Sequence, residues 1–308
     1  MTRESLGVSS NGCILTGARV DSGAKVSEGT HHQQFNPSNT GYGMLTVFTS
    51  ANRGYHPFII PYLSSVLSHN KGSAVELVVE DVDHFKTQNS KALALISDAF
   101  SEGSFLLRSG DFQKVGSHAI RFMEEPTIQS DYVYIGDIDV LVLSEIPPIH
   151  LKQMEKTGLP FSNLLRQDNP QRLTGLHFTR RDAHYPLPSV EIPTGHGWDE
   201  VMLTRQVEAK GHSTANAIGA ARPMHGPHLS LRRAPLNPVG WDINPAYAEA
   251  FKEFATGDLW KSLVPLLDDK YKRLFLLLET AMMGRFVSVM EGYESPLRAY
   301  CMWDDWNK

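Results

Sequence analysis

Short apolar runs alternate with amphipathic segments in the first half of the chain. Residues 44–50, 75–79 and 132–135 are compact runs rich in β-branched and aromatic residues, which is typical of strands. Residues 57–69 and 91–100 repeat apolar side chains at the spacing of one helix face. Strands that alternate with helices of this length build βαβ units. The pattern therefore predicts an α/β fold with a mostly parallel, twisted sheet flanked by helices.

The remaining chain is less regular. Residues 1–43 are polar and rich in Gly, Ser, Asn and His, which predicts a weakly packed lead-in. Residues 151–245 hold many His, Gly and Pro residues and predict loops with short strands. Residues 246–308 predict helices, and the apolar positions of 271–290 favour a core or homodimer contact over a membrane contact. We expect one ligand-binding domain over 44–245, with 246–308 packed on it as a helical subregion.

Composition and charge exclude several classes of protein. Hydrophobic residues make up 41% of the 308 residues, and the 24 glycines bring the apolar share close to the globular average of about 45–50%. Such a chain can bury a substantial core, which argues against a disordered or collagen-like protein. The formal net charge of −5 offers no basic excess for binding nucleic acid.

Cysteine usage and hydropathy bear on location. Cys13 and Cys301 lie far apart in the sequence, so a disulfide framework is not expected and a reducing, cytoplasmic location fits. The first residues are polar and do not resemble an apolar signal segment. The longest apolar stretch is interrupted by Glu279, Gly284 and Arg285, short of the roughly 18 uninterrupted apolar residues of a membrane span. We therefore expect no transmembrane segment.

The sharpest chemical signal lies directly after the strand predicted at 132–135. Gly136 is followed by Asp137 and Asp139, with further apolar residues behind them. On extended backbone the two carboxylates point the same way, and at the carboxyl end of a parallel strand they face the ligand crevice of an open sheet. A divalent cation relieves their repulsion, and oxygen ligands suit Mg²⁺ or Mn²⁺ together with substrate phosphates. The other interpretation is a turn with solvated aspartates between strands.

Four further segments accompany this one along the chain. Residues 44–68 read MLTVFTSANRGYHPFIIPYLSSVLS, a strand, a small loop with Asn, an aromatic residue and a helix. After GDID at 136–139 come RLTGLHF at 172–178, GWDEVML at 197–203 and MHGPH at 224–228. The series resembles nucleotide-sugar glycosyltransferases of the GT-A fold, a Rossmann-related α/β fold. It resembles especially family 8, the glycogenin and galactosyltransferase group.

The resemblance implies a donor site built on the first strand and its loop. Residues Thr49, Ser50 and Asn52 match the loop that meets the base and ribose, and Tyr55 matches an aromatic residue that stacks on the base. Gly175 matches a glycine that lets the sugar approach the backbone closely. We expect these residues to bind the nucleotide sugar.

The resemblance also implies a metal site and a reaction centre. Asp137 and Asp139 match the Asp-x-Asp motif, and His225 matches the late histidine that supplies the third metal ligand. Asp199 and Glu200 match an acidic helix start beside the reacting sugar carbon. Asp199 would orient sugar hydroxyls or stabilise positive charge, and Glu200 would flank it or act as a nucleophile. The other interpretation of this pair is helix capping, with Asp199 as the cap.

The activity implied by the resemblance is a Mn²⁺- or Mg²⁺-dependent sugar transfer from a nucleotide-diphosphate sugar to a hydroxyl acceptor such as a glycan, with retention of the anomeric configuration. UDP is the expected nucleotide. The chain departs from the family pattern in that Ser50-Ala51 stands where an Asp is usual and Glu200 where a Gln is usual, and Lys-Pro-Trp does not follow the late His. The nucleobase and the sugar therefore stay open, with guanosine as the other base.

Two other functions remain open. A metal-dependent nucleotidyl or phosphoryl transferase can use the same carboxylates, although the sequence has no Gly-x-x-x-x-Gly-Lys-[Ser/Thr] loop. The other is a catalytically silent sugar-nucleotide-binding protein on the same fold, against which the intact Asp-x-Asp argues. A zinc site is not indicated, because the 13 histidines show no tight ligand spacing. Of His225 and His228, only one is expected to reach a given ion.

Overall fold

The computed structural model describes most of the chain between residues 43 and 282, namely residues 43–101, 104–113, 117–166, 172–193, 195, 197–217, 224–229 and 245–282. The polar lead-in expected at 1–43 lies almost wholly outside the described residues, as does the end of the chain after residue 282. Both cysteines also lie outside the described residues.

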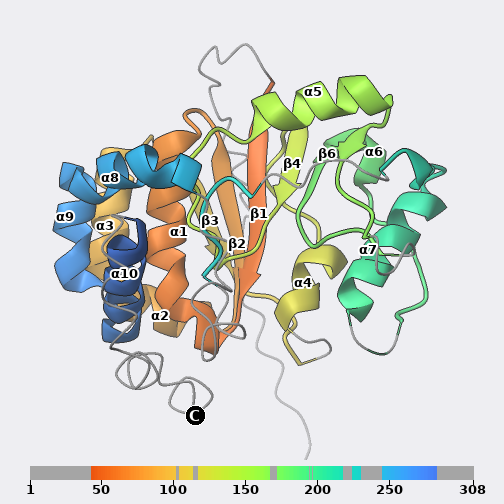
Figure 1. The fold of residues 1–308 in the computed structure, drawn as a ribbon. Helices are drawn as coiled ribbons and strands as arrows, with labels where there is room; N and C mark the ends of the chain where they lie inside the picture. The colour runs from red at the N-terminus through yellow and green to blue at the C-terminus, as the bar shows by residue number, and fades with distance from the viewer. Residues whose placement is uncertain are drawn as a thin grey trace, which may run out of the picture. The chain divides into compact units, whose positions relative to one another are not determined.

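A sheet forms the centre of the described region, with strands in the order β3-β2-β1-β4-β6-β5 (Figure 1). The strands are β1 (Leu45–Ala51), β2 (Ala74–Val79), β3 (Phe105–Arg108), β4 (Tyr132–Ile135), β5 (Phe161–Ser162) and β6 (His177–Arg180). Strands β3, β2, β1 and β4 pair in parallel, and β6 pairs antiparallel with both β4 and β5. The predicted mostly parallel sheet flanked by helices is confirmed.

Helices connect and cover the strands. They are α1 (His56–His69), α2 (Val82–Gln88), α3 (Ser90–Ala99), α4 (Ser117–Met123), α5 (Pro147–Thr157), α6 (Arg181–His184), α7 (Trp198–Ala209), α8 (Ala248–Thr256), α9 (Asp258–Leu263) and α10 (Asp269–Met282). Short 3₁₀ turns are η1 (Arg53–Tyr55), η2 (Ala215–Ala217), η4 (Pro245–Tyr247) and η5 (Val264–Leu266). None of the helices within the described residues is long and apolar enough to span a bilayer.

Successive side chains of a strand point to opposite faces of the sheet, and helices cover and bury both faces. On β1, Val47 packs into a cluster that includes residues of α1, α3 and α8–α10. Its neighbour Phe48 packs into a second cluster, with residues of α4 and α7. Figure 1 shows the same arrangement, with these two groups of helices on opposite sides of the sheet. Each large apolar side chain buried in this way contributes about 1.5–3 kcal/mol.

The helices after residue 245 pack through aromatic rings. Tyr271 of α10 meets Phe58 of α1 edge to face, with ring centroids 5.3 Å apart. Trp260 of α9 lies 4.7 Å from Phe254 of α8 and 4.6 Å from Phe275 of α10, centroid to centroid. The described part of the apolar stretch expected at 271–290 is therefore core.

Candidate metal centre and donor site

The end of β4 is fixed by contacts with its neighbours in the sheet. The Gly136 amide donates to the Phe48 carbonyl at 3.1 Å. The Gly136 carbonyl accepts from the Thr49 hydroxyl at 2.8 Å and from the Arg121 guanidinium at 2.9 Å. A β-carbon at residue 136 would lie 2.8 Å from the Tyr62 hydroxyl, so glycine is needed for this close approach. These contacts hold the next residues at the carboxyl edge of the sheet.

The backbone from Asp137 to Asp139 differs from the expectation. It forms a turn in place of the extended backbone expected from the sequence, and the Val140 amide points back to the Asp137 carbonyl at 3.3 Å. The two carboxylates still come together, but through a turn and not through strand alternation. Asp139 is 7% exposed and Asp137 is half-buried.

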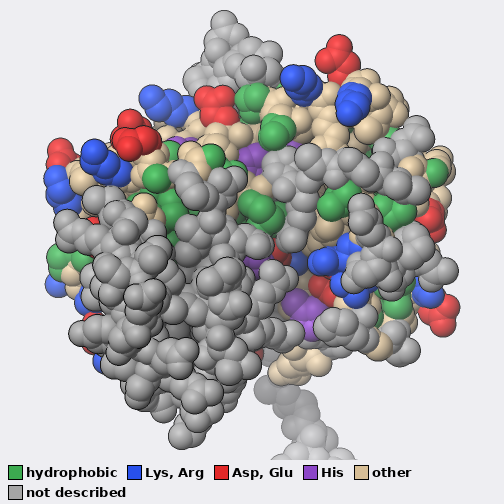
Figure 2. Space-filling view, in the orientation of Figure 1, with side chains coloured by type: hydrophobic (Ala, Val, Ile, Leu, Met, Phe, Trp, Pro, Cys, Tyr) green, Lys and Arg blue, Asp and Glu red, His purple; other side chains and the backbone are tan. Residues whose placement is uncertain are grey.

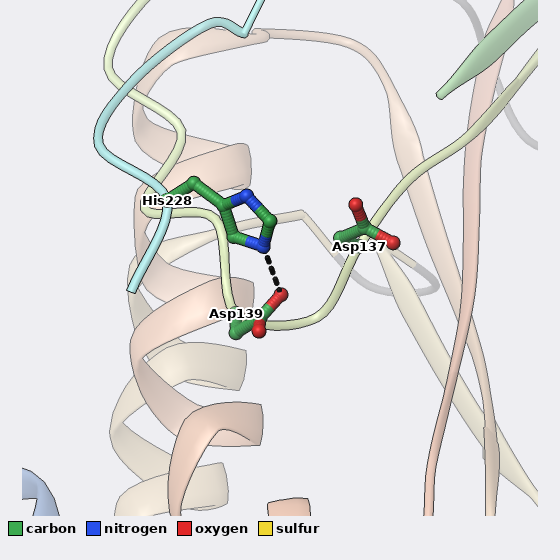
Figure 3. A group of neighbouring side chains, drawn as sticks. All are labelled: Asp137, Asp139 and His228. Atoms are coloured by element: carbon green, nitrogen blue, oxygen red, sulfur yellow. Dashed lines mark hydrogen bonds and ion pairs between the residues drawn. The ribbon is translucent and has the colours of Figure 1, made fainter. Parts of the chain in front are cut away.

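A histidine from a distant segment joins the pair. Asp137, Asp139 and His228 each offer one ligand atom, and these atoms all lie within 4.8 Å of one another (Figure 3). The His228 Nε2 atom lies 3.1 Å from Asp139 Oδ1. Two carboxylates and an imidazole at these separations are a donor set that fits a divalent cation such as Mn²⁺.

His228 reaches the pair because residues 225–229 run beside residues 139–143. The Leu229 amide donates to the Asp139 carbonyl at 2.8 Å, and the Leu141 amide donates to the Pro227 carbonyl at 3.0 Å. Val140 and His228 form an antiparallel bridge. The position of the imidazole is therefore set by a short ladder between two segments far apart in the sequence.

His225 lies outside this group. Its Nε2 atom is 2.9 Å from Nε2 of His150, and its Nδ1 atom is 3.1 Å from the Ser144 hydroxyl. Burial lowers the pKa of His225 to about 4. Among the residues that the structure describes, the third place beside the aspartates, expected for His225, is taken by His228.

A buried arginine completes the charge pattern. Arg121 of α4 forms an ion pair with Asp137. Burial opposes its charged form, but the carboxylates of Asp137, Asp199 and Asp139 outweigh burial and raise the pKa of the guanidinium. Three carboxylates thus surround one guanidinium, so negative charge exceeds positive charge among these side chains, as a cation site requires.

The acidic pair at the start of α7 divides into two environments. The helix begins after Gly197, whose φ of 69° is left-handed, so Asp199 and Glu200 both lie in the first turn. The alternative role of Asp199 as the helix cap is therefore wrong. Asp199 is half-buried, and its carboxylate contributes to the raised pKa of Arg121.

Glu200 is held by positive groups and by the backbone. Its carboxylate accepts from Nε and Nη2 of Arg166 at 2.8 and 2.6 Å. It forms an ion pair with Arg172 at 2.7 Å and accepts from the Gly175 amide at 2.9 Å. A β-carbon at residue 175 would lie 2.8 Å from Nη2 of Arg121 and 3.8 Å from Oδ1 of Asp137. Gly175 therefore lies beside Arg121 and Asp137, and a side chain at this position would displace the Arg121 guanidinium.

The expected nucleoside residues lie at the carboxyl end of β1. Thr49 is fully buried and its hydroxyl supports Gly136, and Ser50 is 7% exposed. Asn52 caps η1 by accepting from the Tyr55 amide at 3.2 Å, and the Tyr55 ring lies 5.6 Å from that of Phe58. A cleft of about 490 Å³ opens beside this turn. It is lined by residues of η1, α1, the start and length of α2, η5 and the start of α10, among them Arg53, His56, Asp81, His84, Asp268 and Lys270.

Comparisons with known proteins were made for the whole chain. No protein-family model matches the sequence, and no curated protein matches it. Among solved structures, the chain is similar to the mannosyltransferase PcManGT from Pyrobaculum calidifontis in complex with GDP-Man and Mn²⁺. The identity is 14%, the match covers 88% of this chain and 87% of that chain, and the TM-score is 0.39. At this identity and TM-score the likeness assigns no activity to the chain.

Charged side chains of both signs are visible on the face shown in Figure 2. Acidic and basic side chains lie along the margins of this face, and a smaller group of both signs lies right of its centre, beside a histidine, without one large patch of either sign among the described residues. The concentration of charge that matters is the buried one around Arg121. In the sequence its signal is a single arginine inside the apolar run Ala119–Met123, and the pattern does not say what that arginine meets.

Proposed function

We propose that the protein is a metal-dependent glycosyltransferase that uses a nucleotide-diphosphate sugar. The observation that carries the proposal is the convergence of Asp137, Asp139 and His228 at the carboxyl edge of a mostly parallel sheet. Open α/β sheets bind ligands at this edge, and a phosphate-bearing ligand needs a cation or arginine there. Arg121 lies at the same place, and the three aspartates that act on it outnumber its single positive charge.

The two aspartates and His228 would hold Mn²⁺ or Mg²⁺. Imidazole is a better ligand for Mn²⁺ than for Mg²⁺, so we favour Mn²⁺. A bound cation would offset the negative charge that develops on the leaving diphosphate. Arg121 fixes the orientation of Asp137 through their ion pair and brings a second positive charge to the same region.

The nucleoside would bind at η1, where Asn52 and Tyr55 lie next to the cleft lined by Arg53 and His56. UDP is the proposed nucleotide, on the resemblance of the loop at 49–55 alone. GDP is the competing choice, since Ser50-Ala51 lacks the usual aspartate.

The carboxylate that acts on the sugar is proposed to be Asp199. Glu200 contacts two guanidinium groups and a backbone amide, so its lone pairs are engaged and its nucleophilicity is low. We propose that Glu200 instead positions Gly175 and the start of α7. Asp199 would orient sugar hydroxyls or stabilise positive charge on the ring, and the transfer would retain the anomeric configuration, as the resemblance implies.

The test is to incubate the purified protein with UDP-, GDP-, CDP- and ADP-sugars, Mn²⁺ and a panel of sugars as hydroxyl acceptors, and to analyse the products. Release of nucleoside diphosphate that stops in excess EDTA is expected, and the anomeric configuration of the product, measured by NMR coupling constants, decides retention. Pyrophosphate release would identify a nucleotidyl transferase. Binding of a sugar nucleotide with no product across the panel would identify a binding protein.

A further inference from the structure

A chain of hydrogen-bonded side chains lies behind the metal centre. The Ser162 hydroxyl of β5 lies 2.7 Å from Nδ1 of His150 on α5. Nε2 of His150 lies 2.9 Å from Nε2 of His225, whose Nδ1 lies 3.1 Å from the Ser144 hydroxyl. His150 and His225 are each only 1% exposed. These hydrogen bonds therefore link β5, at the edge of the sheet, to the segment that carries His228.

The two imidazoles of this hydrogen-bonded series are neutral at neutral pH. Burial and the neighbouring His225 lower the pKa of His150 well below its usual value, and burial lowers the pKa of His225 to about 4. Two neutral imidazoles that meet through Nε2 must consist of one donor and one acceptor. In each ring, Nδ1 then accepts if Nε2 donates, and donates if Nε2 accepts. A serine hydroxyl can satisfy either role, because it both donates and accepts. All three links can thus form together.

The segment that His225 begins is held in a demanding conformation. His225 has a φ of 61°, in the left-handed region that non-glycine residues seldom adopt. A β-carbon on Gly226 would overlap the Leu141 carbonyl oxygen, so the backbones of the two segments touch. The Leu143 amide donates to the His225 carbonyl at 2.7 Å. An unfavourable conformation of this kind persists only where its surroundings fix it.

We infer that His150 is a positioning residue of the metal centre. By holding His225 through the Nε2–Nε2 hydrogen bond, His150 fixes residues 225–229 against residues 139–143, and this places His228 on Asp139. The inference rests on the proposed function for the identity of the bound group. Partners that orient a metal ligand typically change metal affinity by roughly 10–100-fold when they are removed.

The competing explanation is packing alone. The His150 ring stacks on Phe178 with centroids 4.8 Å apart and an interplanar angle of 3°, and lies 5.5 Å from the Tyr134 ring. His150→Phe keeps a planar ring for this stack and removes the hydrogen bond to His225. His150→Gln loses the ring but keeps an amide near the position of Nε2. The two explanations therefore predict opposite orders for the two variants.

The experiment compares these variants with His184→Phe. His184 is also buried, and its ring lies against those of His177 and Tyr185. Two quantities are measured in the full-length protein: amide exchange of Leu141, Leu143 and Leu229 without metal, and the Mn²⁺ dissociation constant by EPR, with nitrogen couplings that report imidazole ligation. A fourth variant, Ser144→Ala, removes only the partner of His225 Nδ1 and disturbs the core least.

The expected result is faster exchange at the three amides and a Mn²⁺ affinity lower by roughly 10–100-fold in His150→Phe. We expect a smaller loss in His150→Gln, a smaller loss still in Ser144→Ala, and wild-type values in His184→Phe. The inference is overturned if His150→Phe matches the His184 control, or if His150→Gln is the worse of the two. A wild-type protein without Mn²⁺ binding refutes the proposed metal site, and the amide exchange then still decides whether His150 holds the segment.

Discussion

Two clusters of carboxylates and arginine lie on the same sheet and differ in how their charges are satisfied. At β2, Glu76 is fully buried and accepts from Arg108 at 2.7 Å. Its two oxygens also accept from the Thr127 amide, the Thr127 hydroxyl and the Ile128 amide, at 2.7–3.1 Å. The buried charge of Glu76 is thus satisfied by a guanidinium, two backbone amides and a hydroxyl of the same chain.

At the end of β4 the balance is different. Asp137 pairs with Arg121, and Asp139 meets an imidazole, which is itself a metal-ligand type. With Asp199 nearby, three carboxylates share one guanidinium. The first cluster satisfies a buried charge with a complete set of donors, and the second keeps surplus negative charge at a sheet edge where ligands bind. Burial alone therefore does not distinguish the two clusters, because Glu76 and Asp139 are both buried.

The largest expected effect removes the saturated carboxylate. Glu76→Ala leaves Nε of Arg108 and two backbone amides without their buried acceptor, while Nη1 of Arg108 keeps its ion pair with Glu124. We expect the free energy of unfolding to fall by about 3–5 kcal/mol, as for other broken buried pairs. Urea unfolding measures the change. In Asp182→Ala, which removes an exposed pair with Arg180, the loss should stay below about 1 kcal/mol. Equal losses in the two variants would contradict the structural assignment of Glu76.

The second prediction concerns the carboxylate of the metal centre. Asp139→Ala removes a ligand together with its like-charge repulsion, so we expect little change in the free energy of unfolding. Turnover should fall by roughly 10²–10³-fold, the size expected for losing one electrostatic partner of a developing charge. Initial rates under saturating Mn²⁺ and donor measure this, with Asp182→Ala as the active control. A variant that keeps wild-type turnover would show that Asp139 is not a ligand.

The third prediction, with the smallest expected effect, concerns how the free energy of unfolding depends on pH through the buried histidines. Burial lowers the pKa of His184 to about 3 and lowers that of His177 well below its usual value. Below pH about 6.5 the unfolded chain takes up protons that the folded chain refuses, so stability falls as the pH falls toward the folded pKa. Each such histidine contributes a slope of up to about 1.4 kcal/mol per pH unit.

Urea unfolding at pH 7, 6 and 5 measures that slope, and His184→Phe should make it shallower. Parallel pH profiles for the variant and the wild type would mean that His184 takes up its proton in the folded protein. If Asp139→Ala changed the slope of stability against pH and His184→Phe did not, the surplus negative charge around Asp139 would be the source of the pH dependence.

The fold was predictable because its signals are local. The apolar run at 44–50 and the helical spacing at 57–69 each depend on neighbouring residues, and they match β1 and α1 within one residue at each end. The Asp-x-Asp motif was predictable as a candidate for the same reason. What the sequence did not reveal is which distant side chains meet it.

His228 and Arg121 illustrate that limit. His225 and His228 share one short loop, in which His225 lies against His150 and Ser144 whereas His228 lies against Asp139. Arg121 reaches Asp137 because α4 lies across β1 in the packed structure. Contacts of this kind depend on how layers pack, and no periodicity in the sequence records them.

The ladder between 139–143 and 225–229 has a consequence for the order of events during synthesis. Asp139 and His228 are separated by 89 positions. A nascent chain that has emerged only as far as α5 can pair β1 with β2 and β4, but it does not yet include His228. Closing so long a loop costs entropy that local pairing does not. Cation affinity would then arise only after most of the sheet had formed, so that a ribosome-bound fragment ending before residue 225 would carry the strands without the centre.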